Sequence, residues 1–308
     1  MTPLVLALPG GERLAGRLHR ELRAAPGTLT IHRFPDGEIR IRISGDTEGR
    51  TVILVGSLDR PDGKILPLLF AAATARDLGA AAVGLVAPYL AYLRQDIAFQ
   101  PGEAVSARHF ARVLSAAGSW LVTVDPHLHR VHDLGELFSI PTEIVHAAPH
   151  IAGWIQAHVA RPVIIGPDPE SAQWVGEVAT HAGAPYVILA KRRRGDRTVE
   201  LSLPSMTAVR HLQPVLVDDI VSSGATMLAA VRLLQQAGLA RPVIVAVHAV
   251  MAEGAAESFV QAGGLELVTC DTVDHPTNRI DLTGAIRKAV AHRLQLDARQ
   301  GLAASAWR

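Results

Sequence analysis

The sequence predicts an α/β fold made of two tandem domains, each a mostly parallel sheet flanked by helices. Short apolar runs alternate with amphipathic runs along the whole chain, as strands and helices do in α/β proteins. Most of the short runs are apolar at every position, which is typical of strands buried on both faces of a parallel sheet. The 308 residues are enough for two domains of ordinary size.

The candidate strands are short apolar runs that end at Gly, Pro or polar residues. In chain order they are Leu4–Leu8, Val52–Val55, Ala82–Ala87, Trp120–Val124, Val163–Ile165, Tyr186–Leu189, Val215–Val217, Val243–Val247 and Leu265–Cys270. The longer stretches between them are amphipathic, which predicts helices. These helices are Glu12–Arg23, Ile65–Leu78, Ala104–Ala116, Ala148–His158, Ser171–His181, Thr226–Gln236 and Leu282–Leu294.

The order of elements is repeated in the two halves of the chain. Residues 51–89 and residues 214–248 both read as strand, polar loop, helix and strand, at an offset of about 160 residues. Any two strand–helix–strand units would give this pattern. We favour the other interpretation, that the chain contains two copies of one nucleotide-binding type of fold. We therefore expect domains at residues 1–147 and 148–308, and leave open whether the last helix packs against the first domain.

The two copies differ at the point where a site is expected. After its first strand the second copy has Asp218-Asp219, whereas the first copy has Gly56-Ser57. Only the second copy retains paired carboxylates, so we expect a single active site of this type.

Composition excludes several classes of protein. Hydrophobic residues make up 49% of the chain and charged residues 19%, so a large core can form. The net charge is +1, which disfavours an electrostatic grip on nucleic acid. The single cysteine, Cys270, cannot form an intramolecular disulfide. Apolar stretches such as Ala80–Ala87 are too short to cross a membrane, and we expect a cytoplasmic protein.

The most informative segment runs from Pro214 to Thr226. A buried strand is followed by two acids and by a turn of small residues that opens a helix. Backbone N–H groups at such a helix start can hold a phosphate, and the acids suit the vicinal hydroxyls of a sugar or a nearby Mg²⁺. Together they suggest ribose 5-phosphate. The simpler alternative is a helix cap at Ser223 beside two solvated acids.

This segment resembles the phosphoribosyl-binding loop of type I phosphoribosyltransferases and of ribose-phosphate pyrophosphokinases, which make phosphoribosyl pyrophosphate (PRPP). The resemblance implies a phosphoribosyltransferase-like fold in both domains. The residues that it implies for ribose 5-phosphate are Asp218, Asp219, Ser222, Ser223, Gly224, Ala225 and Thr226.

Two further segments resemble the pyrophosphokinases alone. Residues 34–39, Phe-Pro-Asp-Gly-Glu-Ile, are similar to their Phe-Ser-Asp-Gly-Glu loop, although an Asp-Gly turn between strands is also common. Residues 88–96 are similar to their Pro-Tyr-x-x-Tyr-Ala-Arg-Gln-Asp run, which phosphoribosyltransferases do not carry. The ATP-binding residues that these segments imply are Phe34, Asp36, Glu38, Arg94, Gln95 and Asp96.

The resemblance also implies a metal site and a catalytic loop. His127 and Asp168 each follow a predicted strand, and they are implied to hold the Mg²⁺ of Mg·ATP. Residues 190–197 resemble the flexible catalytic loop of the pyrophosphokinases, with Lys191 and Arg193 as its catalytic cations. Without the resemblance, such a run would be a solvated hairpin or a nucleic-acid patch.

The family implies transfer of the diphosphoryl group of Mg·ATP to O1 of ribose 5-phosphate, giving PRPP and AMP, in a homo-oligomer that is a dimer or a hexamer. Two segments depart from the family. The phosphate loop at residues 222–226 reads Ser-Ser-Gly-Ala-Thr instead of Asp-Thr-Ala-Gly-Thr, and residues 97–106 replace a basic stretch. A PRPP-consuming phosphoribosyltransferase, a non-catalytic regulatory paralogue and a related sugar-phosphate diphosphokinase stay open as alternatives.

Overall fold

The computed structural model divides the chain into two compact units. One contains residues 1–145 and 283–308, and the other contains residues 146–282. The structure describes residues 1–128, 130–131, 133–194, 198–202, 209–222, 224–251 and 254–305.

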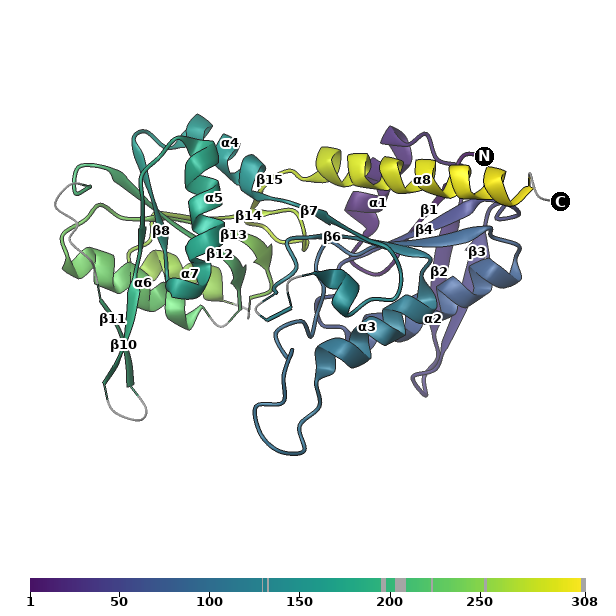
Figure 1. The fold of residues 1–308 in the computed structure, drawn as a ribbon, viewed down its shortest axis with the longest axis horizontal. Helices are drawn as coiled ribbons and strands as arrows, with labels where there is room; N and C mark the ends of the chain where they lie inside the picture. The colour runs from purple at the N-terminus through teal and green to yellow at the C-terminus, as the bar shows by residue number, and fades with distance from the viewer. Residues whose placement is uncertain are drawn as a thin grey trace. The chain divides into compact units, whose positions relative to one another are not determined.

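The first unit is built on a parallel sheet (Figure 1). Its strand order is β1-β4-β5-β6-β7, and the strands are β1 (Leu4–Ala7), β4 (Thr51–Val55), β5 (Ala82–Val86), β6 (Trp120–Val124) and β7 (Thr142–Val145). Its helices are α1 (Glu12–Glu21), α2 (Asp62–Asp77), α3 (Ser106–Ala117), the short 3₁₀ turn η1 (Leu134–Glu136) and α8 (Thr283–Ser305). These strands have almost no exposed side chains, in agreement with their uninterrupted apolar sequence.

Helix α8 is held in the first unit by polar contacts as well as by packing. The indole Nε1 of the fully buried Trp120 on β6 donates to Asp297 Oδ2 at 2.8 Å. The imidazole Nδ1 of His292 lies 3.0 Å from Glu143 Oε2 on β7, and Arg287 pairs with a glutamate of α1. The C-terminal helix is therefore part of the unit formed by the N-terminal residues.

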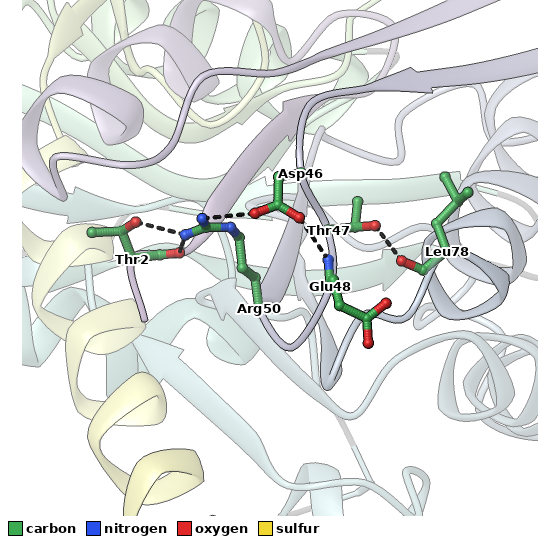
Figure 2. A network of polar contacts seen from close by, with 6 residues as sticks. All are labelled: Thr2, Asp46, Thr47, Glu48, Arg50 and Leu78. Atoms are coloured by element: carbon green, nitrogen blue, oxygen red, sulfur yellow. Dashed lines mark hydrogen bonds and ion pairs between the residues drawn. The ribbon is translucent and has the colours of Figure 1, made fainter.

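A hairpin of β2 (Thr28–Arg33) and β3 (Ile39–Ser44) accompanies this sheet. A polar network joins the chain start to the turn after β3 (Figure 2). Arg50 donates to the carbonyl oxygen of Thr2 and to Asp46 Oδ2, each at 3.0 Å, and this guanidinium lowers the pKa of Asp46. The hydroxyl of Thr47 donates to the carbonyl oxygen of Leu78 at the end of α2.

The second unit also contains a parallel sheet, of strand order β15-β14-β13-β12-β8-β9. Its strands are β8 (Pro162–Gly166), β9 (Tyr186–Ile188), β12 (Gln213–Val221), β13 (Val243–Ala249), β14 (Glu266–Cys270) and β15 (Asn278–Ile280). The helices are α4 (Ala148–His158), η2 (Pro169–Ser171), α5 (Ala172–Ala182), α6 (Ala225–Gln236) and α7 (Ala255–Gln261). A hairpin of β10 (Ala190–Arg194) and β11 (Thr198–Ser202) projects from this unit (Figure 1).

The structure confirms the predicted fold class, an α/β chain with two parallel sheets. The repeated order is present as β4–α2–β5 and β12–α6–β13, each with its two strands paired in parallel. The hairpins β2–β3 and β10–β11 and the short elements β7, α7 and β15 were not among the predicted elements. In the described part of the chain, no helix combines the length and apolarity needed to span a membrane.

Candidate active site

The strand order of the second unit brings two polar loops to one edge of its sheet. The chain places β9 on one side of β8 and then returns to form β12 on the other side. Parallel α/β sheets bind ligands outside the carboxyl ends of strands at such a reversal. Leu216 of β12 is in register with Ile165 of β8, the last aligned pair before Asp168. The prediction that Asp218-Asp219 follow the strand was wrong, because β12 continues through both acids to Val221 and stays paired with β13.

The carboxyl of Asp218 has a strongly perturbed pKa. Burial raises it most, and the negative charges of Asp219 and Asp168 raise it further, to about 8. The backbone N–H of Asp219 donates to Asp218 Oδ1 at 3.0 Å, which only partly offsets these effects. Near neutral pH Asp218 therefore retains its proton unless a cation or a donor enters.

Asp168 is fixed by the turn that begins after β8. Its Oδ1 accepts from the N–H groups of Glu170 and Ser171 at 3.1 and 3.2 Å. Ser171 Oγ in turn donates to the carbonyl oxygen of Asp168 at 2.6 Å. A Cβ at Gly166 would lie 2.5 Å from Ser171 Oγ and 2.6 Å from Ile188, so this turn requires glycine at the strand end.

The predicted phosphate loop lies between β12 and α6. Gly224 is the residue before the helix, with φ +72°, and a Cβ there would lie 2.9 Å from the buried ring of Phe259. Ala225 and Thr226 form the exposed first turn of α6, whose N–H groups point away from the helix. Ser222 is partly buried, and Ser223 lies outside the described residues.

The predicted catalytic residues Lys191 and Arg193 lie on β10. Their backbones pair with Leu201 and Val199 of β11. The side chains of both residues lie outside the described part of the structure, as do residues 195–197 between β10 and β11.

The predicted ATP-side residues Phe34, Asp36 and Glu38 belong to the first unit, at the turn of the β2–β3 hairpin. The N–H of Phe34 donates to the carbonyl oxygen of Glu38 at 2.8 Å, and the N–H of Gly37 donates back to Phe34 at 3.0 Å. Gly37 has φ +94°, and the N–H of Glu38 donates to Asp36 Oδ1 at 3.1 Å. This closed turn leaves 36% of the Phe34 side chain exposed.

The predicted residues Arg94, Gln95 and Asp96 follow β5 in a loop with one strained position. Tyr92 has φ +64°, and its hydroxyl donates to an aspartate of α2. Arg94 and Gln95 are exposed. Asp96 is buried, and its carboxylate accepts from the side chain of Arg130 at 2.8 Å and from the backbone N–H of that residue at 3.2 Å.

The two predicted metal ligands lie in different units. His127 is partly buried after β6 in the first unit, whereas Asp168 follows β8 in the second. Within the described ranges, no three His, Cys, Asp or Glu side chains form a group that could hold a metal ion. The structure thus groups Asp168 with Asp218 and Asp219, and places the ATP-side residues on separate loops of the first unit.

Two residues near the candidate site, Arg130 and His248, are not among the residues that the sequence predicts for it. Arg130 neutralises Asp96, and only the structure pairs them across 34 positions. His248 is the second-last residue of β13 and is in register with Ile220. It is 1% exposed, and its Nδ1 lies 2.9 Å from Thr272 Oγ1. A polar residue at the carboxyl end of an apolar strand was the available signal for His248.

Comparisons with known proteins agree with this architecture. Residues 4–118 match the N-terminal domain of ribose phosphate pyrophosphokinase, and residues 137–283 match the phosphoribosyl transferase domain. The crystal structure of phosphoribosylpyrophosphate synthetase from Mycobacterium smegmatis superposes with a TM-score of 0.83 at 22% identity, covering 96% of this chain and 99% of that one. The class is therefore a chain of two phosphoribosyltransferase-type domains.

Curated relatives make the assignment narrower. A ribose-phosphate pyrophosphokinase from Methanopyrus kandleri is 34% identical over 292 residues, 93% of this chain and 98% of that protein. One from Methanosarcina mazei is 31% identical over 291 residues, 93% of this chain and 95% of that protein. The chain belongs to the ribose-phosphate pyrophosphokinase family.

Proposed function

We propose that the protein transfers the diphosphoryl group of Mg·ATP to O1 of ribose 5-phosphate, giving PRPP and AMP. The observation that carries the proposal is the grouping of Asp168, Asp218 and Asp219 beside the start of α6, at the reversal of strand order. At this edge of the sheet, the N–H groups at the start of α6 can bind an anion, and the nearby carboxylates can accept hydrogen bonds from a diol. Membership of the pyrophosphokinase family supports the same reaction.

In this proposal the second unit holds the acceptor. The turn at residues 222–226 and the first N–H groups of α6 bind the 5-phosphate, while Asp218 and Asp219 orient the ribose hydroxyls. O1 attacks the β-phosphorus, the bond between that phosphorus and the oxygen bridging to the α-phosphorus breaks, and AMP leaves with that oxygen. The proton of the O1 hydroxyl passes to solvent water during the transfer. Catalysis is then positioning and charge neutralisation, without a covalent intermediate.

The first unit supplies the nucleotide contacts in this proposal. Phe34 provides an aromatic face for adenine, and Asp36 and Glu38 offer acceptors to its amino group. Arg94 pairs with the polyphosphate, and Gln95 adds a polar contact. Asp96 contributes through the loop that it holds with Arg130.

Lys191 and Arg193 complete the proposed catalytic machinery. They neutralise charge on the transferring group and exclude water that would hydrolyse ATP. A homo-oligomer, as a dimer or a hexamer, is part of the proposal and can be tested by light scattering.

We keep His127 and Asp168 as the proposed protein ligands of Mg²⁺, on the family resemblance, and the donor type that fits this ion is the carboxylate of Asp168. Mg²⁺ prefers oxygen donors and usually combines one or two carboxylates with substrate phosphates and water, so a cage of three protein ligands is not needed. Burial raises the pKa of Asp218 most and the charges of Asp219 and Asp168 raise it further, and a cation bound nearby would lower it. When bound, Mg²⁺ would neutralise phosphate charge.

The test is an AMP-release assay with ATP and a series of pentose phosphates. We expect AMP and PRPP in equal amounts with ribose 5-phosphate. PRPP consumption that depends on an added base, without AMP release, would instead identify a phosphoribosyltransferase. Binding of nucleotide without turnover would identify the regulatory paralogue.

A further inference from the structure

The outward face of the β2–β3 hairpin carries cations beside an exposed aromatic ring. In this antiparallel pair Thr30 is opposite Arg42 and His32 is opposite Arg40. The side chains of all four residues are exposed, whereas isoleucines at alternate positions of β3 turn toward the core. Since side chains alternate between faces, Phe34, two residues beyond His32, lies on the same face.

The ring of Phe34 is held on this face by two neighbours. The His32 ring meets it edge-on, with centroids 4.6 Å apart and planes at 80°. The guanidinium carbon of Arg40 lies over the ring, 5.9 Å from its centroid. An Arg over one face of the ring leaves the other face for a second planar group.

The charge on this face is not neutralised by the fold. Within the described residues, the side chains of Arg40 and Arg42 form neither an ion pair nor a hydrogen bond. Arg42 lies two residues beyond Arg40, about 7 Å further along the strand. The acids of the hairpin, Asp36 and Glu38, lie at its turn, so charge changes from negative to positive along the face.

We propose that Arg40 is a positioning residue for the nucleotide, which it serves by fixing Phe34 as a stacking platform, and that Arg42 attracts the phosphates of the same nucleotide. The inference rests on the proposed function, because it deepens the assignment of Phe34 to ATP. A base would stack on the face of Phe34 opposite Arg40, with its amino group toward the acids and its phosphates toward Arg42. The ligand class is therefore an adenine nucleotide with a polyphosphate chain.

The experiment is calorimetric titration of the full chain with adenosine, AMP and Mg·ATP, for the wild type and for R40A, R40K and R42A. The matched control is R112A, which removes an exposed arginine from α3. We expect R40A to weaken binding of all three ligands by about two- to fivefold, and R40K to restore much of that loss because it keeps a cation over the ring. R42A should weaken Mg·ATP by about threefold to tenfold, less at high salt, and leave adenosine unchanged.

A purely structural role for Arg40 would shift the thermal midpoint without this ligand pattern. The inference is overturned if R40A and R42A bind Mg·ATP as R112A does, if R42A weakens adenosine as much as Mg·ATP, or if the wild type binds an oligothymidylate more tightly than Mg·ATP. Binding needs no turnover, so the AMP-release assay tests the proposed reaction separately. Arginine-dependent nucleotide binding without AMP release would reject the reaction and retain this inference.

Discussion

Replacement of Asp218 by Asn should stabilise the ligand-free protein increasingly as the pH rises. The pKa of Asp218 is raised from 3.8 to about 8 in the folded protein, chiefly by burial and then by Asp219 and Asp168. Between these values the folded state keeps a proton that the unfolded chain has released, so folding stability falls with rising pH through this window. Asparagine carries no charge and escapes that loss.

The size of the effect follows from the shift. About four pH units at roughly 1.4 kcal/mol each set an upper limit on the order of 5 kcal/mol. Sharing of charge among the coupled carboxyls reduces it. We expect the stability advantage of D218N over the wild type to grow by about 1–3 kcal/mol between pH 5.5 and 8.5.

The assay is urea unfolding in EDTA at pH 5.5, 7.0 and 8.5, followed by tryptophan fluorescence, to which Trp154 and Trp174 of the second unit and Trp120 of the first contribute. The control is D77N, which neutralises an exposed acid at the end of α2 and should show no such trend. An advantage of D218N that is constant or that shrinks as the pH rises would refute the reasoning, because it would mean that Asp218 is ionised throughout.

Three other substitutions test the proposed roles. Lys191→Ala should lower kcat by orders of magnitude with a modest change in KM, and a near-normal kcat would remove Lys191 from the mechanism. Gly224→Ala should destabilise the second unit by about 1–2 kcal/mol, because φ is +72° and Phe259 lies 2.9 Å from the added Cβ. It should also raise the KM for ribose 5-phosphate more than the KM for ATP. Equal changes in both KM values would argue against a phosphate site at this turn. Asp96→Asn should raise the KM for ATP several-fold by releasing Arg130, and no change in steady-state kinetics would separate this ion pair from nucleotide binding.

Much of the fold follows directly from the sequence. Fully apolar runs such as Val163–Ile165 and Val243–Val247 predict buried parallel strands, and the structure contains them as β8 and β13. The strand β3 also has a clear signal, since Ile and Arg alternate from Ile39 to Ile43, which is typical of a half-exposed strand.

Other elements could not be placed from local pattern. The last helix continues to Ser305, beyond the predicted end at Leu294, and belongs to the N-terminal unit through contacts such as Trp120 with Asp297. These contacts join residues that are far apart in the chain, and no periodicity within a helix reports its distant partner.

Some residues of the candidate site can also be found from local sequence, whereas the contacts between them cannot. Asp218 and Asp219 could be found because two adjacent acids rarely occur beside a run of buried apolar strand residues, although the structure places them inside β12. The proximity of Asp168 depends on β12 lying beside β8, and that strand order is a property of the whole sheet. The Asp96–Arg130 pair likewise depends on two loops from neighbouring strands.

The most direct test of the central claim is a crystal structure of the protein with ribose 5-phosphate and a non-hydrolysable ATP analogue. We expect the 5-phosphate at the start of α6 between Ser222 and Thr226, the ribose hydroxyls against Asp218 and Asp219, and O1 facing the β-phosphorus of the analogue. A pentose phosphate bound elsewhere, with the turn before α6 empty or filled by packed side chains, would contradict the account.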